Sequence, residues 1–187
     1  MNAPLAAEKL QAKFGEAITK VNEFRDETTV YVDRAKIVEI CKSCRDDLGF
    51  DHLVDICSVD NMGEDPRFEV VYHLYSYADL CTLRIKAPVP EDDATIDSIT
   101  SLWDSADWHE RETYDMMGIK FNNHPELRRI LMWDGFPFHP LRKDFPLAGK
   151  PSEMPDVAFS NAAPLEGGPF VTCSGGDTKK REPRSRA

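Results

Sequence analysis

The sequence contains no stretch that approaches the roughly 20 consecutive apolar residues of a membrane-spanning helix. Its first ten residues lack the apolar core of a secretory signal and the arginine-rich character of a transit peptide. The five cysteines are scattered rather than arranged as a paired framework, which favours a reducing compartment over secretion. These absences predict a soluble cytoplasmic protein without a membrane span.

Motifs of self-contained catalysis are also absent. The sequence has no glycine-rich phosphate loop, no H-E-x-x-H and no G-x-S-x-G. Glu110 and Glu112 would point about 200° apart on a helix, so they cannot serve one substrate as an acid–base pair. A serine or cysteine nucleophile paired with a histidine stays open, but no pattern recommends it.

Cys41 and Cys44 form a C-x-x-C pair, a spacing that occurs in zinc and iron–sulfur sites. The pair shares a predicted helical face with Ile37, Ile40 and Leu48, and no second pair has metal spacing. We therefore predict buried thiols that behave as small hydrophobic groups. The alternative is an independent thiol or metal enzyme that uses Cys41 and Cys44.

The net charge of −10 is unevenly distributed. Residues 1–134 carry 15 basic and 27 acidic side chains, whereas residues 135–187 carry 8 basic and 6 acidic ones. An acidic body disfavours nucleic acid, whose affinity depends on neutralised phosphates. The basic residues in 179–186 suit a solvated tail or contact with an acidic protein surface, and a nucleic-acid adaptor is the rival interpretation.

Apolar periodicity predicts helices and strands in mixed order. Helices are expected over 5–14, after an N-cap at Asp33 up to Gly49, over 95–103 and over 105–117. Strands are expected over 17–25, 28–32, 51–59, 67–76 and 80–87, with Pro88 and Pro90 stopping the sheet. The order predicts an α+β fold, a two-layer sandwich of a mainly antiparallel sheet with helices on one face.

The character of the chain changes at Gly135. Eight of the 13 prolines and six of the 10 glycines lie within residues 135–187, yet apolar residues persist there. We predict a globular domain over 1–134 and an extended, proline-rich C-terminal docking segment over 135–187, whose last residues are disordered.

The densest feature is the run of charges, Met and Tyr over 110–117. Glu110 falls in the same helical row as Trp103, Ala106, Tyr114 and Met117. A carboxylate in an apolar row needs a partner, because burying it unpaired is costly. We predict a buried or interfacial ion-pair network in which arginines pair with carboxylates. Its predicted members are Glu110, Arg111, Glu112, Asp115, His124, Arg128 and Arg129.

A second stretch, residues 135–147, combines aromatic residues, three prolines and a central Arg-Lys-Asp. Residues before proline favour extended backbone, so we predict a docking strand. Its predicted contact residues are Phe136, His139, Arg142, Lys143, Asp144 and Phe145.

Together these two stretches resemble the C subunit, or 30-kDa subunit, family of proton-pumping NADH:quinone oxidoreductase (respiratory complex I). The first family motif falls on Glu110, Arg111, Glu112, Asp115, Met116, Met117, His124, Arg128, Ile130 and Leu131. The second, Gly-Phe followed by His-Pro-Leu-Arg-Lys-Asp-Phe-Pro-Leu, falls on 135–147, with Phe138 where the family often has glycine. The resemblance is strong over about residues 50–150.

The resemblance implies a non-catalytic subunit of the peripheral arm, on the cytoplasmic face of the bacterial inner membrane. It implies that this chain binds no cofactor, while the whole complex uses FMN, iron–sulfur clusters, NADH and quinone. The implied partners are the D subunit, which helps form the quinone site, and the neighbouring iron–sulfur subunits. An equivalent subunit of a ferredoxin-linked or hydrogenase-type complex is the nearest alternative.

Overall fold

The computed structural model describes residues 2–146. Contacts divide the chain into two units, Met1–Leu131 and Met132–Ala187; the sequence placed this division after residue 134. The elements, all in the first unit, are α1 (Ala3–Phe14), β1 (Ile18–Phe24), β2 (Glu27–Val32), α2 (Ile37–Asp46), β3 (His52–Asp60), β4 (Phe68–Ser76), β5 (Cys81–Val89), β6 (Thr95–Asp97), α3 (Ala106–Met117) and β7 (Lys120–Asn122). The predicted course of 147–187 lies outside the described residues.

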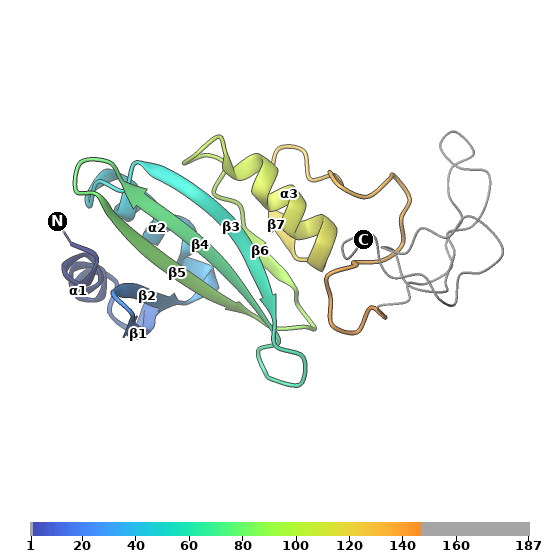
Figure 1. Ribbon diagram of the computed structural model, residues 1–187, viewed down its shortest axis with the longest axis horizontal. Helices are drawn as coiled ribbons and strands as arrows, with labels where there is room; N and C mark the ends of the chain where they lie inside the picture. Colours follow the sequence, from blue (N-terminus) through green and yellow to red (C-terminus); the bar gives the residue numbers. More distant parts are fainter. Residues whose placement is uncertain (1, 147–187) are drawn as a thin grey trace, which may run out of the picture. The chain divides into compact units, whose positions relative to one another are not determined.

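The main sheet has five strands in the order β1-β2-β5-β4-β3 (Figure 1). Every neighbouring pair is antiparallel except β2 and β5, which run parallel and pair over Thr29–Tyr31 and Arg84–Lys86. Helices α1 and α2 pack on one face of this sheet. The predicted α+β sandwich with a mainly antiparallel sheet is confirmed.

The core lies between that sheet face and the helices. Alternate residues of β4 point inward and are fully buried, including Phe68, Tyr72 and Leu74. Leu10 of α1 and Ile40 of α2 are also buried. Burying such side chains is the main favourable term in folding, at roughly 1.5–3 kcal/mol each.

The helix predicted after Asp33 forms in two steps. The Asp33 side chain accepts a hydrogen bond from the Ala35 amide at 2.9 Å, which caps a 3₁₀ turn over Arg34–Lys36. Helix α2 follows directly and places Cys41 and Cys44 on its buried face. The cap predicted from the sequence is therefore confirmed.

The helix predicted over 95–103 was wrong. Residues Thr95–Asp97 form β6, which pairs in parallel with β7 through the register Ile96–Phe121. Ile96, Ile99 and Trp103 have helical spacing and are all buried, but Ile96 is buried by pairing with a strand 25 residues away in the chain. A local periodicity cannot reveal such a distant partner.

Pro88 does not stop the sheet as predicted, since β5 continues to Val89 and Pro88 pairs with Glu69 of β4. On its other side, β5 pairs with β2 only up to Lys86. Pro88 therefore lies beyond the last β2–β5 pair. On that side of β5 there is no neighbouring strand to which the N–H that proline lacks could donate.

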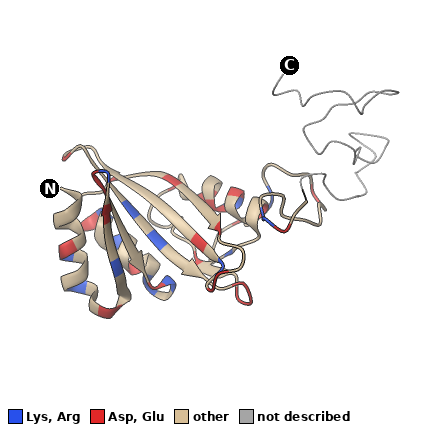
Figure 2. Cartoon of the chain, turned by 60° about the horizontal axis from the view of Figure 1, so that its bottom comes forward, with Lys and Arg blue, Asp and Glu red and all other residues tan. Residues whose placement is uncertain are grey.

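Charged side chains of both signs are interspersed over the strands and helices (Figure 2). On the sheet they link neighbouring strands, as Lys86 does with Glu69 at 2.8 Å and Arg84 with Glu27 at 2.6 Å. A buried pair closes the β3–β4 hairpin: Arg67 donates through Nε and Nη2 to the two oxygens of Asp60, at 2.8 and 2.9 Å.

Replacing Asp60 by Ala should therefore destabilise the protein by about 3 kcal/mol, because it leaves a buried guanidinium short of its partner. The figure is at the low end for a buried pair, since Arg67 keeps the exposed Glu91 at 2.5 Å. Urea unfolding measures the loss. The control is Glu39→Ala, which removes an exposed pair with Lys36 and should leave the midpoint unchanged. Equal midpoints for both variants would contradict the assignment.

Candidate functional site

Helix α3 carries an unusual number of buried polar residues, namely Glu110, Arg111, Thr113 and Asp115. The helix lies along β3 (Figure 1), where the Thr113 hydroxyl donates to the Ile56 carbonyl at 3.3 Å. Gly118 ends it in a left-handed conformation with φ 76° and its amide donates to the Tyr114 carbonyl. Strand β7 follows, and the chain then returns along α3 as residues 124–131, which we call the return segment.

Asp115 is the main anchor of the return segment. Its side chain is fully buried and accepts hydrogen bonds from the backbone amides of Ile130 and Leu131, at 3.1 and 2.8 Å. Its other oxygen lies 2.5 Å from Nη1 of Arg129. A buried carboxylate with two amide donors and a guanidinium partner is fully compensated for its lost hydration.

Arg111 holds the same segment through its carbonyl groups. Its Nε donates to the Arg128 carbonyl at 3.2 Å and its Nη2 to the Arg129 carbonyl at 3.3 Å. The guanidinium also lies over the Trp108 ring, 5.2 Å from its centroid, a cation–π contact. Arg111 therefore donates to carbonyl groups, and Asp115 accepts from amide groups, of the same stretch of backbone.

His124 anchors the start of the return segment. Its Nδ1 accepts from the Glu126 amide at 3.1 Å, so that nitrogen carries no proton. Its Nε2 lies 3.1 Å from Oδ1 of Asp107 and 3.3 Å from the Asp107 carbonyl. This pattern assigns the neutral tautomer with its proton on Nε2. The His124 side chain is completely buried.

Glu110 contrasts with Asp115. Its Oε1 accepts from the Ile99 amide at 2.8 Å, while Oε2 has no hydrogen-bond partner among residues 2–146. The nearest charged or titratable nitrogen to Oε2 is Nε2 of His124, at 3.9 Å. Burial raises the pKa of Glu110 to about 7, although the Ser98 hydroxyl and the Ile99 amide act to lower it.

The predicted network is therefore only partly assembled. Asp115 and Arg129 pair as expected, but Glu110 pairs with no arginine within the described part of the chain, so that prediction was wrong. Arg128 was also expected to meet a buried carboxylate. Instead its Nε lies 3.4 Å from the Glu126 carboxylate, with both side chains more than 60% exposed. Glu112 is exposed on the outer side of α3.

Sequence reasoning missed the partners that matter most here, which are backbone groups. The amides of Ile99, Ile130 and Leu131 have no side-chain signature. Asp107 was missed as well, although its position three residues before Glu110 places both on one helical face.

The prediction that Cys41 and Cys44 are buried is confirmed, since both have no exposed surface. Burial raises the pKa of Cys41 well above its usual value and that of Cys44 to about 12. A thiol that stays protonated is a poor nucleophile and a poor metal ligand. Residues 2–146 contain no group of three or more His, Cys, Asp or Glu side chains placed to hold a metal ion. No helix in the same range is long and apolar enough to span a bilayer.

The predicted docking strand is not extended over residues 135–146. Gly135 has φ 86°, which lets the Phe136 amide return to the Trp133 carbonyl at 3.1 Å. Further turns bring the Arg142 amide to the His139 carbonyl and the Phe145 amide to the Arg142 carbonyl.

Aromatic packing explains these turns. The Phe136 ring lies 4.6 Å from Trp133, 5.6 Å from Phe138 and 6.5 Å from Phe145, centroid to centroid. Clustered rings bury more apolar surface than an extended strand in water could. A hollow of about 160 Å³ beside the cluster is lined by Pro137, Phe138, His139, Arg142, Asp144 and Phe145. Lys143 is exposed.

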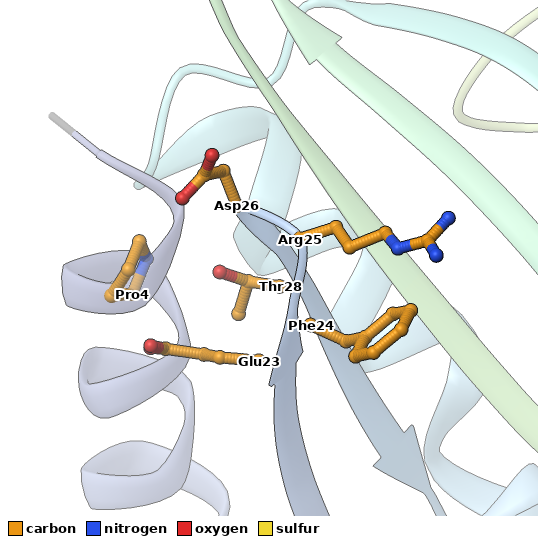
Figure 3. Close-up of a pocket in the computed structure, with 6 residues that line it drawn as sticks. All are labelled: Pro4, Glu23, Phe24, Arg25, Asp26 and Thr28. Atoms are coloured by element: carbon orange, nitrogen blue, oxygen red, sulfur yellow. The ribbon is translucent and has the colours of Figure 1, made fainter.

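A larger hollow of about 460 Å³ lies between the start of α1 and the tip of the β1–β2 hairpin (Figure 3). Its lining residues are Pro4, Glu23, Phe24, Arg25, Asp26 and Thr28. The Arg25 guanidinium lies over the Phe24 ring, 5.1 Å from its centroid. The hollow is open and brings together no acid–base or nucleophile–base pair.

Asp115→Ala should destabilise the first unit by roughly 3 kcal/mol, because two amides and a guanidinium lose one acceptor. The local consequence should be faster amide hydrogen exchange at Ile130 and Leu131. Glu112→Ala, which removes an exposed carboxylate from the same helix, is the matched control. Unchanged exchange at both amides in Asp115→Ala would show that another contact holds the return segment.

The fold and this site define an α+β domain in which buried polar side chains hold helix α3 and the return segment together. Comparison with known proteins gives its family. The model of the family described as respiratory-chain NADH dehydrogenase, 30 Kd subunit, matches residues 30–151. The chain belongs to this family, as the two motifs predicted.

Its relatives and structural neighbours agree. The chain is 52% identical over 148 residues to the NADH-quinone oxidoreductase C subunit of Citrifermentans bemidjiense, covering 79% of this chain and 92% of the relative. The corresponding protein of Geobacter sulfurreducens is 51% identical over 146 residues, covering 78% and 90%.

Among solved structures, the trypsin-resistant fragment (1-134) of Nqo5 superposes with a TM-score of 0.60 at 30% identity, covering 66% of this chain and 98% of the fragment. A chain of an archaeal membrane-bound sulfane sulfur reductase has a TM-score of 0.65 at 21% identity, covering 77% and 85%. The latter likeness concerns the fold alone.

Proposed function

We propose that this chain is a non-catalytic, peripheral-arm subunit of a proton-translocating NADH:quinone oxidoreductase. In this role it holds the quinone-site D subunit and the neighbouring iron–sulfur subunits in register, at the cytoplasmic face of a bacterial inner membrane. FMN, the iron–sulfur clusters, NADH and quinone are handled by other subunits. The observation that carries the proposal is the 52% identity to an NADH-quinone oxidoreductase C subunit, over 92% of that protein's length.

The geometry of the site supports a structural role. Asp115, Arg111 and His124 direct their polar atoms at the backbone of the return segment or at neighbouring side chains. Polar atoms that already form these contacts are not available to bind a substrate. They fix the chain immediately before Met132, where the second unit begins, and so define where the docking segment starts.

Two surfaces are proposed to meet the partners. One is the aromatic cluster of the second unit with Arg142, Lys143 and Asp144. The other is the outer side of α3 around Trp108, whose side chain is 60% exposed. Arg111 holds the ring from one side, and the exposed Glu112 lies one turn later on the same helix. A rigid exposed tryptophan beside an acidic residue suits an apolar socket rimmed by Lys or Arg on a partner.

The proposal is tested by isolating a tagged full-length copy from its cell membranes in mild detergent. The expected result is co-purification of the other oxidoreductase subunits with NADH:quinone activity. Recovery of a free monomer beside an assembled complex that lacks the chain would refute it.

Trp108→Ala should weaken association with the partner subunits by at least tenfold, since an interface tryptophan typically contributes about 2 kcal/mol or more. Competition for assembly between tagged variant and untagged wild type provides the measurement. Leu80→Ala is the control, because Leu80 is 75% exposed in the β4–β5 turn. Equal incorporation of both variants would remove Trp108 from the interface.

Trypsin should cut the isolated chain beyond about residue 135, where Arg142 and Lys143 are the first candidate sites, and leave the first unit intact. A relative whose trypsin-resistant fragment spans 1-134 supports this expectation. In the assembled complex the same sites should be protected. Equal cleavage rates in both states would count against docking of the second unit.

A further inference from the structure

Glu110 is the buried carboxyl on α3 that has the Ile99 amide and the Ser98 hydroxyl as neighbours but no cationic partner among residues 2–146. Its side chain has no exposed surface, and Oε2 forms no hydrogen bond within residues 2–146. No Lys or Arg of these residues pairs with it. Asp115, five residues later on the same helix and just as buried, has an arginine and two amide donors.

The titratable groups that interact with Glu110 come from three elements and a loop. They are Cys41 of α2, Tyr72 of β4, Asp107 of α3, and His124 after β7. None is a fixed cation. The one acid among them, Asp107, repels a negative charge on Glu110 and helps to raise its pKa.

The neighbouring histidine does not supply the missing positive charge. Nδ1 of His124 accepts from the Glu126 amide, and Nε2 directs its hydrogen at Asp107. At 3.9 Å, Nε2 is also beyond hydrogen-bonding distance of Glu110.

Tyr72 reinforces the same conclusion. Its hydroxyl is buried and, like Oε2 of Glu110, has no hydrogen-bond partner within the described residues. The two groups interact electrostatically. The Tyr72 hydroxyl therefore donates no hydrogen bond to Oε2 of Glu110. A buried carboxylate oxygen without a donor penalises the charged form of the group.

We propose that Glu110 is a buried proton-binding site, which stays protonated in the folded protein well above the pH at which an exposed glutamate ionises, so that release of this proton lowers the stability of the fold around α3, the Ser98–Ile99 turn and His124. The inference is independent of the proposed function, because it concerns a single side chain of the isolated domain. The proposal adds a buried titratable side chain to a protein whose other buried acid on α3, Asp115, pairs with Arg129.

The sign of the linkage is fixed by the direction of the shift. Burial raises the pKa of Glu110 from 4.5 to about 7, so the folded state holds one proton more than the unfolded state between these values. Stability from this group is complete below the unfolded pKa, falls as pH rises through this window and changes no further above it.

The test compares the unfolding constant of full-length wild type and Glu110→Gln in urea from about pH 4.5 to 9. Glutamine keeps an oxygen for the Ile99 amide and mimics the neutral acid. The ratio of the wild-type constant to the variant constant should rise at least tenfold between about pH 5 and pH 7, then level off. Taking the ratio cancels other titrations, including that of His73, whose pKa burial lowers.

Glu112→Gln is the matched control, since it removes an exposed carboxylate from the same helix. Its ratio to wild type should not change with pH. A flat ratio for Glu110→Gln, or identical pH profiles for the two variants, would overturn the proposal.

A second measurement uses wild type alone and does not depend on the folding of a variant. The carbon-13 shift of the Glu110 carboxyl, followed by NMR against pH, should show a midpoint above about pH 6. A midpoint at or below about pH 5, the ordinary range of a glutamate, would overturn the proposal.

Discussion

The structure around α3 depends on one interaction, the capture of backbone amides by the Asp115 carboxylate. A return segment without regular secondary structure must find partners for its N–H and C=O groups or leave them to water. Asp115 supplies an acceptor for Ile130 and Leu131, and Arg111 supplies donors for the carbonyls of Arg128 and Arg129. The helix thereby supplies the hydrogen-bond partners that a neighbouring strand would otherwise provide for this segment.

The two buried acids on helix α3 have opposite electrostatic environments. Asp115 remains compatible with full charge because a guanidinium and two amides surround it. Glu110 has one amide donor, the Ser98 hydroxyl and an acidic neighbour, Asp107, but no cationic partner within residues 2–146. Asp115 anchors the end of the return segment, while Glu110 lies beside His124 at its beginning. The two buried carboxylates of one family motif thus have different physical roles, which their residue types alone do not distinguish.

Much of the fold could be predicted because its strands are locally marked. Strands β3, β4 and β5 are bounded by the turns at 61–66 and 77–79, and they start and end within two residues of the predicted limits. The predicted helix over 95–103 failed because the pairing of Ile96 with Phe121 is non-local. The predicted pairing of Arg111 with a carboxylate was wrong for another reason. Arg111 binds backbone carbonyl oxygens, which every residue possesses. Around Phe136, clustering of aromatic rings prevailed over the extended bias that the prolines impose on their neighbours.

These features indicate a protein whose thiols and buried charged side chains stabilise its fold. The Cys41 and Cys44 thiols are buried, the buried arginines hold carbonyls or carboxylates, and the exposed Trp108 is fixed from one side. The most direct test is to express Asp115→Ala as the only copy of the chain, then measure the amount of assembled oxidoreductase and the turnover of each assembled complex. The account predicts less assembled complex with normal turnover per complex. A full amount of assembled complex with slowed turnover would contradict it.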